Sequence, residues 1–222
     1  MDKIEKYEGD HVLAKHARDH HIIKYVYDLV PIIDGPIGVS CSGGADSSIL
    51  LYLLMKNTNH KIYVFTTGNN QKNRKNVEAA CRVVEKCIQL TGNSNIEHHI
   101  SYTDVQSWDT TFPKLEMYLL MGLVNCVYTG ITSNPPREEL ASNVEVNRSP
   151  DVEKRVWYLG NHVCSPFYNI DKKQIRQLYI QAGVLDELFP LTRSCETTND
   201  IGLNHCGQCW WCKEREWAFG KA

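Results

Sequence analysis

The chain has 222 residues, a length that fits one α/β domain with a small appendix. Apolar residues make up 42% of the sequence and charged residues 23%, which excludes a disordered or fibrous protein. The 24 basic and 26 acidic residues give a net charge of -2, and this balance argues against direct binding of nucleic acid.

The N-terminal residues are charged where a secretory signal would be apolar. No signal-peptide core follows residues 1–6, and no apolar stretch approaches the roughly 18 residues that a membrane span needs. We therefore expect a cytoplasmic protein without membrane contact. Apolar residues at helical spacing over residues 11–30, followed by Pro31, predict a helix within an N-terminal extension of residues 1–35.

Strands and helices alternate from residue 36 onward. We expect strands at residues 36–41, 61–67, 96–102, 125–131 and 163–170, and helices at residues 47–55, 72–90, 112–123 and 171–182. This alternation is typical of an α/β fold with a doubly wound parallel sheet, which binds its ligands at the carboxyl ends of the strands. We assign residues 36–190 to this domain and residues 191–222 to a separate C-terminal module.

Residues 133–155 are polar, contain three prolines and lack a clear periodicity. They are expected to form a long loop, and loops of this length are usually functional or mobile. We interpret this one as a lid over the ligand. If the loop is a lid, its basic residues would contact phosphates or an acidic substrate, and if it is not, they would form an ordinary solvated surface. These residues are Arg137, Arg148, Lys154 and Arg155.

The loop after the first of these strands is the most informative segment, because residues 42–48 read Ser-Gly-Gly-Ala-Asp-Ser-Ser. Two glycines allow a tight turn that brings backbone N–H groups close to a ligand, and the following helix start favours an anion. The three serine hydroxyls suit phosphate oxygens, and Asp46 suits a Mg²⁺ ion bound to the same phosphates. The alternative is a plain turn with Asp46 as a helix cap, but the strand, the helix and the serines together favour phosphate binding.

This loop resembles the signature of the PP-loop ATP pyrophosphatases, which cleave ATP between its α and β phosphates. The resemblance implies an adenine nucleotide α-hydrolase-like fold, with ATP and catalytic Mg²⁺ as cofactors. It also implies that Asp46 and Ser47 are catalytic. The ATP-binding residues implied in the same way are Ser40, Ser42, Gly43, Gly44, Asp46, Ser47, Ser48 and Thr66.

Four of the nine cysteines gather near the end of the chain, at Cys195, Cys206, Cys209 and Cys212. Four thiolates at this spacing suit a structural Zn²⁺ ion in a closed tetrahedral site, although Cys-x-x-Cys-x-x-Cys also occurs in iron–sulfur sites. His205 is an alternative ligand. The neighbouring aromatic residues are expected to pack this module onto the main domain, with base stacking as the alternative: Trp210, Trp211, Trp217 and Phe219. The remaining cysteines, Cys41 beside the loop among them, are interpreted as buried thiols.

A PP-loop domain that ends in this cysteine pattern is similar to 7-cyano-7-deazaguanine synthase. Residues 165–184 extend the resemblance, while residues 112–116 and 132–137 differ from the segments that face the substrate in that family. The resemblance implies an ATP-dependent C–N ligase of queuosine (7-deazaguanine) biosynthesis. Such an enzyme adenylates a purine-like carboxylate, 7-carboxy-7-deazaguanine, for attack by ammonia, releases pyrophosphate and forms the nitrile preQ0.

A second function stays open at this point, which is another PP-loop enzyme acting on a different acceptor. A sulfonucleotide reductase would need no ATP cleavage, and a tRNA sulfur-transfer enzyme would need a sulfur donor and a basic surface of tRNA size. A third hypothesis is a non-catalytic module that binds a nucleotide or nucleic acid and uses the cysteine-rich segment for recognition, and the presence of Asp46 argues against it. The sequence also leaves the oligomeric state open, a homodimer included.

Overall fold

The computed structural model describes residues 5–7, 11–13, 35–69, 74–104, 107–136, 138–140, 157–158, 163–167, 170–195 and 205–220. Most of the described strands form one sheet of six. Across the sheet the order is β5 (Ile96–Thr103), β4 (Ile62–Asn69), β3 (Ile37–Ser40), β6 (Cys126–Tyr128), β8 (Val163–Cys164) and β7 (Trp157–Tyr158). The first five run parallel, and β7 pairs antiparallel with β8 at the edge. The predicted parallel sheet is therefore confirmed.

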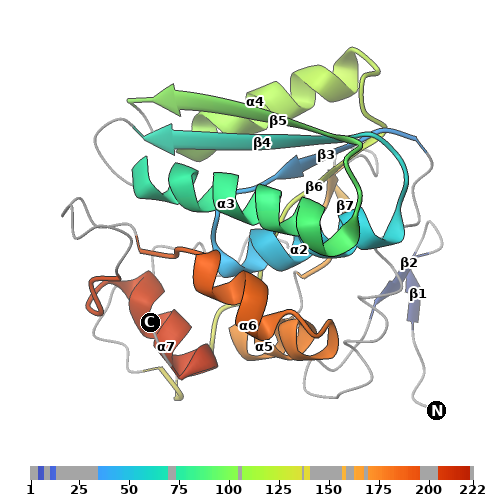
Figure 1. The fold of residues 1–222 in the computed structure, drawn as a ribbon. Coiled ribbons are helices and arrows are strands. Elements are labelled where there is room, and N and C mark those ends of the chain that lie inside the picture. Colours follow the sequence, from blue (N-terminus) through green and yellow to red (C-terminus); the bar gives the residue numbers. More distant parts are fainter. Residues whose placement is uncertain are drawn as a thin grey trace.

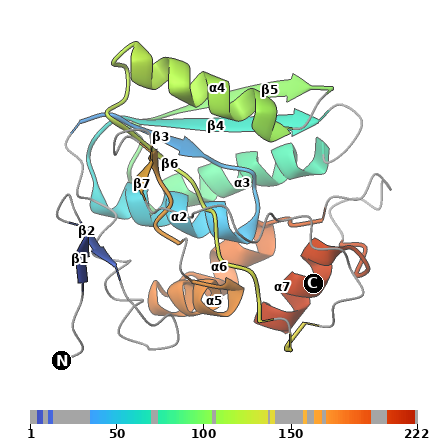
Figure 2. The same ribbon diagram turned by 180° about the vertical axis from the view of Figure 1, so that it is seen from behind.

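Helices cover both faces of the sheet, as a doubly wound fold requires. Helix α4 (Ser107–Leu120) lies on one face, and α2 (Ala45–Asn57) and α3 (Arg74–Thr91) lie on the other (Figures 1 and 2). A further group of helices lies beyond α2: α5 (Lys172–Gln181), α6 (Leu185–Leu188), the 3₁₀ turn η1 (Phe189–Leu191) and α7 (Trp210–Phe219). Helix α5 contacts both α2 and α7, so α2 is enclosed between the sheet and this group.

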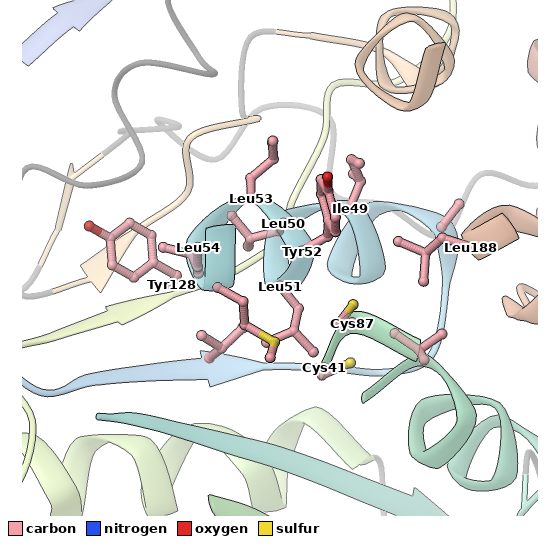
Figure 3. Close-up of a cluster of buried hydrophobic side chains, with 14 of the residues drawn as sticks. Cys41, Ile49, Leu50, Leu51, Tyr52, Leu53, Leu54, Cys87, Tyr128 and Leu188 are labelled. Atoms are coloured by element: carbon pink, nitrogen blue, oxygen red, sulfur yellow. The ribbon is translucent and has the colours of Figure 1, made fainter. Parts of the chain in front are cut away.

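Helix α2 is buried on nearly all sides, as its apolar sequence predicts. Ten of its 13 residues are buried, and Leu51 points toward the strands while Leu53 points away from them (Figure 3). Full burial of one such leucine contributes about 1.5–3 kcal/mol. Cys41 lies in the same apolar cluster and is fully buried. Burial raises the pKa of this thiol to about 11 against hydrogen bonds that lower it, which confirms a buried structural thiol.

Helix α5 begins and ends where the sequence predicts. Asp171 is its N-cap, and its Oδ1 accepts hydrogen bonds from the backbone N–H groups of Lys173 and Gln174, at 2.9 and 3.2 Å. The Gln174 side chain accepts in return from the Asp171 N–H at 2.7 Å, which completes a capping box. Gly183 follows the helix with a φ of 71°, a left-handed conformation that glycine adopts without steric cost.

Several boundaries differ from the predicted ones. Helix α4 begins at Ser107, five residues before the predicted start, because Pro113 is accommodated inside the helix rather than in its first turn. Strand β8 is short because the chain turns away after Cys164. Residue periodicity did not indicate β7, α6, η1 or α7. Of residues 133–155, only 133–136 and 138–140 are described, so the lid stays a prediction.

The helix predicted from residue 11 is wrong at its start. Residues His11–Leu13 form strand β2, which pairs antiparallel with β1 (Glu5–Tyr7) in a separate two-stranded sheet. The apolar residues that carry the helical pattern lie mostly at 22–29, about three turns further along the chain, so they do not determine the conformation at residue 11. Residues 14–34 lie outside the described part of the structure.

None of the helices in the described residues combines the length and the apolar character that crossing a bilayer demands.

Removal of the α5 cap tests how much this local signal contributes. We expect Asp171→Ala to lower the free energy of unfolding by about 1 kcal/mol, because two N–H groups lose their acceptor. Asp171→Asn is the matched control, since asparagine caps helices about as well as aspartate. Urea denaturation followed by circular dichroism measures both variants. Equal destabilisation by the two would show that the carboxylate charge, not the cap, is what matters.

Candidate nucleotide-binding loop and four-cysteine site

The Ser-Gly-Gly loop lies at the topological switch point of the sheet. From β3 the chain proceeds outward through β4 to β5, and then returns to the other side of β3 as β6. The loop of residues 42–44 connects the carboxyl end of β3 to the start of α2, next to the carboxyl end of β6. Open α/β sheets bind their ligands in the crevice at this point. The fold therefore places the predicted phosphate loop where a ligand would bind.

Two glycines let neighbouring segments approach the loop closely. Gly43 has a φ of 77°, and a Cβ there would lie 2.5 Å from the carbonyl oxygen of Asn76 in α3. Gly130 follows β6, and a Cβ there would lie 2.9 Å from the backbone nitrogen of Ser47. Neither backbone atom can move aside without disturbing a helix. Both positions thus require glycine, and the start of α2 is held between α3 and the segment after β6.

Serine side chains organise the loop. The Ser47 hydroxyl accepts a hydrogen bond from the Ser42 backbone N–H at 3.2 Å, and the Ser48 hydroxyl donates to the Gly44 carbonyl at 2.7 Å. Gly44 is the N-cap of α2, and no side chain caps this helix start. The first N–H groups of a helix have no partner within the helix and favour an anion. These features suit a bound phosphate group.

Thr66 lies beneath the loop rather than at its surface. It is 2% exposed, and its hydroxyl donates to the Cys41 carbonyl at 2.7 Å and lies 2.8 Å from His98 Nε2. Because the hydroxyl proton is already committed, His98 Nε2 is the donor in the second contact. Burial, together with the neighbouring His99, lowers the pKa of His98 to about 4, which keeps the ring neutral. Thr66, within β4, therefore joins the end of β3 to β5. Its contact with ATP, like that of Ser40 at the end of β3, stays a prediction.

Asp46 lies in a buried group of three charged side chains from three helices. The ammonium of Lys172, at the start of α5, lies 3.0 Å from Asp46 Oδ2 and 2.9 Å from Glu214 Oε2 of α7. The Lys172 and Glu214 side chains are 3% and 0% exposed, and that of Asp46 is 16% exposed. Oδ1 of Asp46 is buried and has no hydrogen-bond partner among the described residues. A buried carboxylate oxygen in this state is a candidate ligand for a cation.

The four predicted cysteines come together in space. Their sulfur atoms all lie within 4.8 Å of one another, and Cys206 Sγ is 3.8 Å from Cys212 Sγ. Four thiolates around one tetrahedral ion, with bonds of about 2.3 Å, would have sulfurs about 3.8 Å apart. In an iron–sulfur cluster the four thiolates are divided among two or four irons, which sets thiolates on different irons farther apart. The cysteines are therefore spaced for a single ion.

The turn that carries Cys206 favours its thiolate form. Cys206 Sγ accepts hydrogen bonds from the backbone N–H groups of Gln208 and Cys209, at 3.4 and 3.3 Å. Burial acts against the charge, but these bonds and the neighbouring thiols lower the pKa of Cys206 to about 6. Gly207 between them has a φ of 70°, which makes the tight turn possible. A thiolate with such donors is suited to bind a metal ion.

His205 is not part of the four-cysteine group. Its Nε2 accepts a hydrogen bond from the Ser194 backbone N–H at 3.2 Å, so this ring nitrogen is already engaged. The segment before Cys195 also contacts the loop directly, since the Arg193 N–H donates to the Gly43 carbonyl at 2.8 Å. The Arg193 guanidinium in turn donates to the Cys195 carbonyl at 2.6 Å. The four-cysteine site and the predicted phosphate loop are therefore neighbours.

The aromatic residues of this region pack as the first of the two sequence interpretations predicts. Phe219 stacks on Phe189 with ring centroids 3.9 Å apart, and Tyr179 meets both rings edge-on. Trp210 and Phe219 are each 8% exposed, which leaves little ring surface for stacking a base. The Lys173 ammonium lies 4.4 Å from the centre of the Trp217 ring. Helix α7 is thus attached to α5 and η1 by its aromatic side chains.

No protein-family model matches this sequence, and no curated protein matches it either. Among solved structures, the chain is similar to NMN synthetase from Francisella tularensis, with a TM-score of 0.50 and 13% identity over 90% of this chain and 84% of that one. At this identity the similarity concerns the fold alone. It agrees with the predicted adenine nucleotide α-hydrolase-like, PP-loop fold.

Two further solved structures are similar at lower scores. The U34-tRNA thiolase NcsA from Methanococcus maripaludis, with its 4Fe-4S cluster, has a TM-score of 0.49 and 15% identity over 83% of this chain and 73% of that one. The NH3-dependent NAD synthetase from Campylobacter jejuni, in complex with the nitrate ion, has a TM-score of 0.41 and 14% identity over 76% of this chain and 73% of that one.

Sequence reasoning missed Lys172, Glu214 and Arg193 as parts of the site. Lys172 directly follows the predicted cap of α5, where a charged residue reads as solvent-exposed. Glu214 lies within a charged stretch of α7 that gave no apolar periodicity. Burial of these three charges depends on the packing of helices that are far apart in the sequence. A lysine in the first turn of a helix, where a cation is disfavoured, was the one local signal.

The four-cysteine site is tested by its metal content. We expect the purified protein to hold about one metal ion per chain, and Cys206→Ala to weaken metal binding by at least about 100-fold, since loss of a supporting residue alone costs 10–100-fold. Cys81→Ala is the matched control, because Cys81 lies on α3 outside this group. Elemental analysis and competition with a chromophoric chelator measure both. Equal metal affinity in the two variants would contradict the assignment.

Proposed function

We propose that this protein is an ATP-dependent ligase of the PP-loop type, which cleaves ATP between the α and β phosphates and adenylates a carboxylate. The observation that carries the proposal is the loop of residues 42–48 at the switch point of the sheet, with a buried Asp46 oxygen that has no partner among the described residues. The fold supports it, since the loop lies where such a sheet binds ligands. ATP and Mg²⁺ are the cofactors of this proposal.

The residues of the loop divide the chemistry between them. The N–H groups at the start of α2 and the exposed Ser42 hydroxyl would bind the β and γ phosphates that leave as pyrophosphate. Ser47 and Ser48 are buried and their hydroxyls donate to the Gly44 carbonyl, so they hold the loop in shape. Asp46 Oδ1 would hold Mg²⁺, which supplies charge neutralisation for the departing pyrophosphate. Gly43 and Gly130 fix the loop before the nucleotide binds, so little reorganisation is required at the moment of reaction.

Adenylation serves a carboxylate acceptor because a carboxylate is a poor electrophile. Its leaving group would be oxide, and transfer of AMP converts that oxygen into a good leaving group. Ammonia can then attack the acyl carbon, which gives an amide and AMP. A second adenylation of the amide oxygen allows its loss and leaves a nitrile. This sequence requires binding, orientation and charge stabilisation, and it needs no cysteine or histidine nucleophile.

We propose 7-carboxy-7-deazaguanine as the acceptor and preQ0, in queuosine (7-deazaguanine) biosynthesis, as the product. The support is the similarity of residues 165–184 and the terminal cysteine pattern to 7-cyano-7-deazaguanine synthase. A small purine-like carboxylate and ammonia are then the partners, and the near-neutral charge agrees with the absence of a nucleic-acid substrate. A tRNA or sulfonucleotide acceptor is the competing proposal.

We further propose that the metal of the four-cysteine site is Zn²⁺ in a structural role. The sulfur spacing fits one tetrahedral ion, and all four positions are thiolates, which leaves no open position for a substrate or water. We expect the purified protein to be colourless and to contain about one zinc ion per chain. Bound iron together with a visible absorption band would contradict this proposal and favour an iron–sulfur cluster at the four cysteines.

The function is tested by pyrophosphate release. We expect the wild-type protein to release pyrophosphate from ATP in the presence of Mg²⁺, ammonia and 7-carboxy-7-deazaguanine, and Asp46→Asn to lower this rate by about 10²–10³-fold, the usual loss when one stabilising group is removed. Asp186→Asn is the control, since Asp186 is an exposed residue of α6.

The same assay identifies the acceptor when 7-carboxy-7-deazaguanine and ammonia are replaced by other candidate substrates. Release that needs a sulfur donor and tRNA, but no ammonia, would favour the competing proposal. Unchanged release by Asp46→Asn would overturn the assignment of the loop as the catalytic site.

A further inference from the structure

The buried triad of Asp46, Lys172 and Glu214 links the predicted phosphate loop to the four-cysteine site. Asp46 belongs to the first turn of α2, and Glu214 is two residues after the ligand Cys212 on α7. Lys172 joins them through contacts of 3.0 and 2.9 Å. Three helices that are distant in the sequence therefore meet at a single ammonium group.

One ammonium serves both carboxylates of this triad, and the Lys172 and Glu214 side chains are almost completely buried. The neighbouring Arg215 guanidinium adds a second positive charge that acts on Asp46. Asp46 Oδ1 is nevertheless a buried atom without a hydrogen-bond partner among the described residues, and the Asp46 side chain is the most exposed of the three. A cation at Asp46 would give this oxygen a partner.

Glu214 determines how much of the Lys172 charge acts on Asp46. With Glu214 in its place on α7, the ammonium is shared between two carboxylates at nearly equal distances. If Glu214 were displaced from Lys172, the ammonium would pair with Asp46 alone and compete with a divalent cation there. A buried acid on α7 thus keeps a second acid, on α2, available as a metal ligand.

The position of Glu214 depends on both ends of α7. The helix begins directly after Cys209, its N-cap, and Cys212 lies in its first turn, so a metal ion bound by the cysteines fixes this end. Phe219, stacked on Phe189, fixes the other end. Arg215, next to Glu214, donates to the Thr192 hydroxyl at 2.7 Å. This buried hydrogen bond holds α7 midway between its two fixed ends.

We propose that Glu214 is a positioning residue that couples the four-cysteine site to the cation site at Asp46. The proposal rests on the function proposed above. Metal bound by the cysteines holds Glu214 against Lys172, which leaves Asp46 its charge for Mg²⁺ bound with ATP. By thermodynamic reciprocity, Mg²⁺ and ATP at the loop raise the affinity of the cysteines for their own metal ion.

The first test measures the Mg²⁺ requirement for nucleotide binding. Binding of a non-hydrolysable ATP analogue is followed by calorimetry at increasing Mg²⁺ concentration. We expect Glu214→Gln to raise the Mg²⁺ concentration for half-saturation at least about fivefold, the lower end of usual coupling. Glu216→Gln is the matched control on the same helix, because the Glu216 side chain is 56% exposed. It should leave the requirement unchanged, whereas a merely structural role of Glu214 would not alter Mg²⁺ dependence selectively.

The second test needs no variant and stands if Glu214→Gln fails to fold. The affinity of the wild-type cysteines for Zn²⁺ is measured by competition with a chromophoric chelator, with and without the ATP analogue and Mg²⁺, and with Mg²⁺ alone as the control. We expect the analogue with Mg²⁺ to raise this affinity at least about fivefold.

The outcomes separate this proposal from the function on which it rests. If the wild-type protein binds no ATP analogue at any Mg²⁺ concentration, the proposed function fails and the coupling fails with it. If the analogue binds, but a folded Glu214→Gln has the wild-type Mg²⁺ requirement, the coupling is overturned and the function stands. An unchanged Zn²⁺ affinity in the presence of the bound analogue and Mg²⁺ overturns the coupling in the same way.

Discussion

The rest of the site depends on one buried ammonium group. Lys172 begins α5, and its side chain joins the first turn of α2 to the middle of α7. Removal of one partner from such a buried group costs about 3–5 kcal/mol, because the remaining charge is left without compensation. The arrangement is therefore a specific solution: it fixes three helices relative to one another, and it does so at the loop that follows β3. An apolar residue at this position would offer no ammonium group to join the two carboxylates beside the loop.

The loop itself is held by backbone contacts rather than by its own side chains alone. Gly43 lies against the start of α3, and Gly130 lies against the start of α2, at distances that exclude any Cβ. The Arg193 N–H adds a hydrogen bond to the Gly43 carbonyl, and the Tyr179 hydroxyl donates to the Ala45 carbonyl at 2.7 Å. These contacts come from both sides of the loop. Fixed donors of this kind stabilise developing charge effectively because they need no reorganisation when the charge appears.

The sequence was sufficient to predict the parts of the structure that are encoded locally. The all-apolar α2, the amphipathic α3 and the capped α5 follow from residue periodicity and from Asp171, and the spacing of four cysteines predicted their common site. A strand of two residues such as β7 gives no periodic signal, since alternation needs at least four residues to be recognised. The strand predicted at residues 163–170 is present, but only as the two residues of β8. The start of α4 was misplaced because Pro113 is usual in a first helical turn and rare further inside.

The charged contacts of the site could not be predicted, for a different physical reason. Lys172 and Glu214 are 42 positions apart, and each reads locally as a solvent-exposed residue of a polar helix face. Their burial follows from how α5 and α7 pack, which depends on the stacking of Phe219 on Phe189 and on the four cysteines. The apolar residues and the cysteine of α7 could thus be recognised in the sequence, while the charge that they position could not.

This division suggests a reason for the candidate metal site at a short helix near the end of the chain. Helix α7 has ten residues, of which only Trp210, Ala218 and Phe219 contribute buried apolar side chains besides the ligand Cys212. So small an apolar surface cannot offset the cost of burying Glu214 and Arg215 in the same helix. An ion bound by the four cysteines would supply folding free energy to such a segment. The fold can then place a buried carboxylate beside Lys172 at a point where apolar packing alone would be insufficient to hold it.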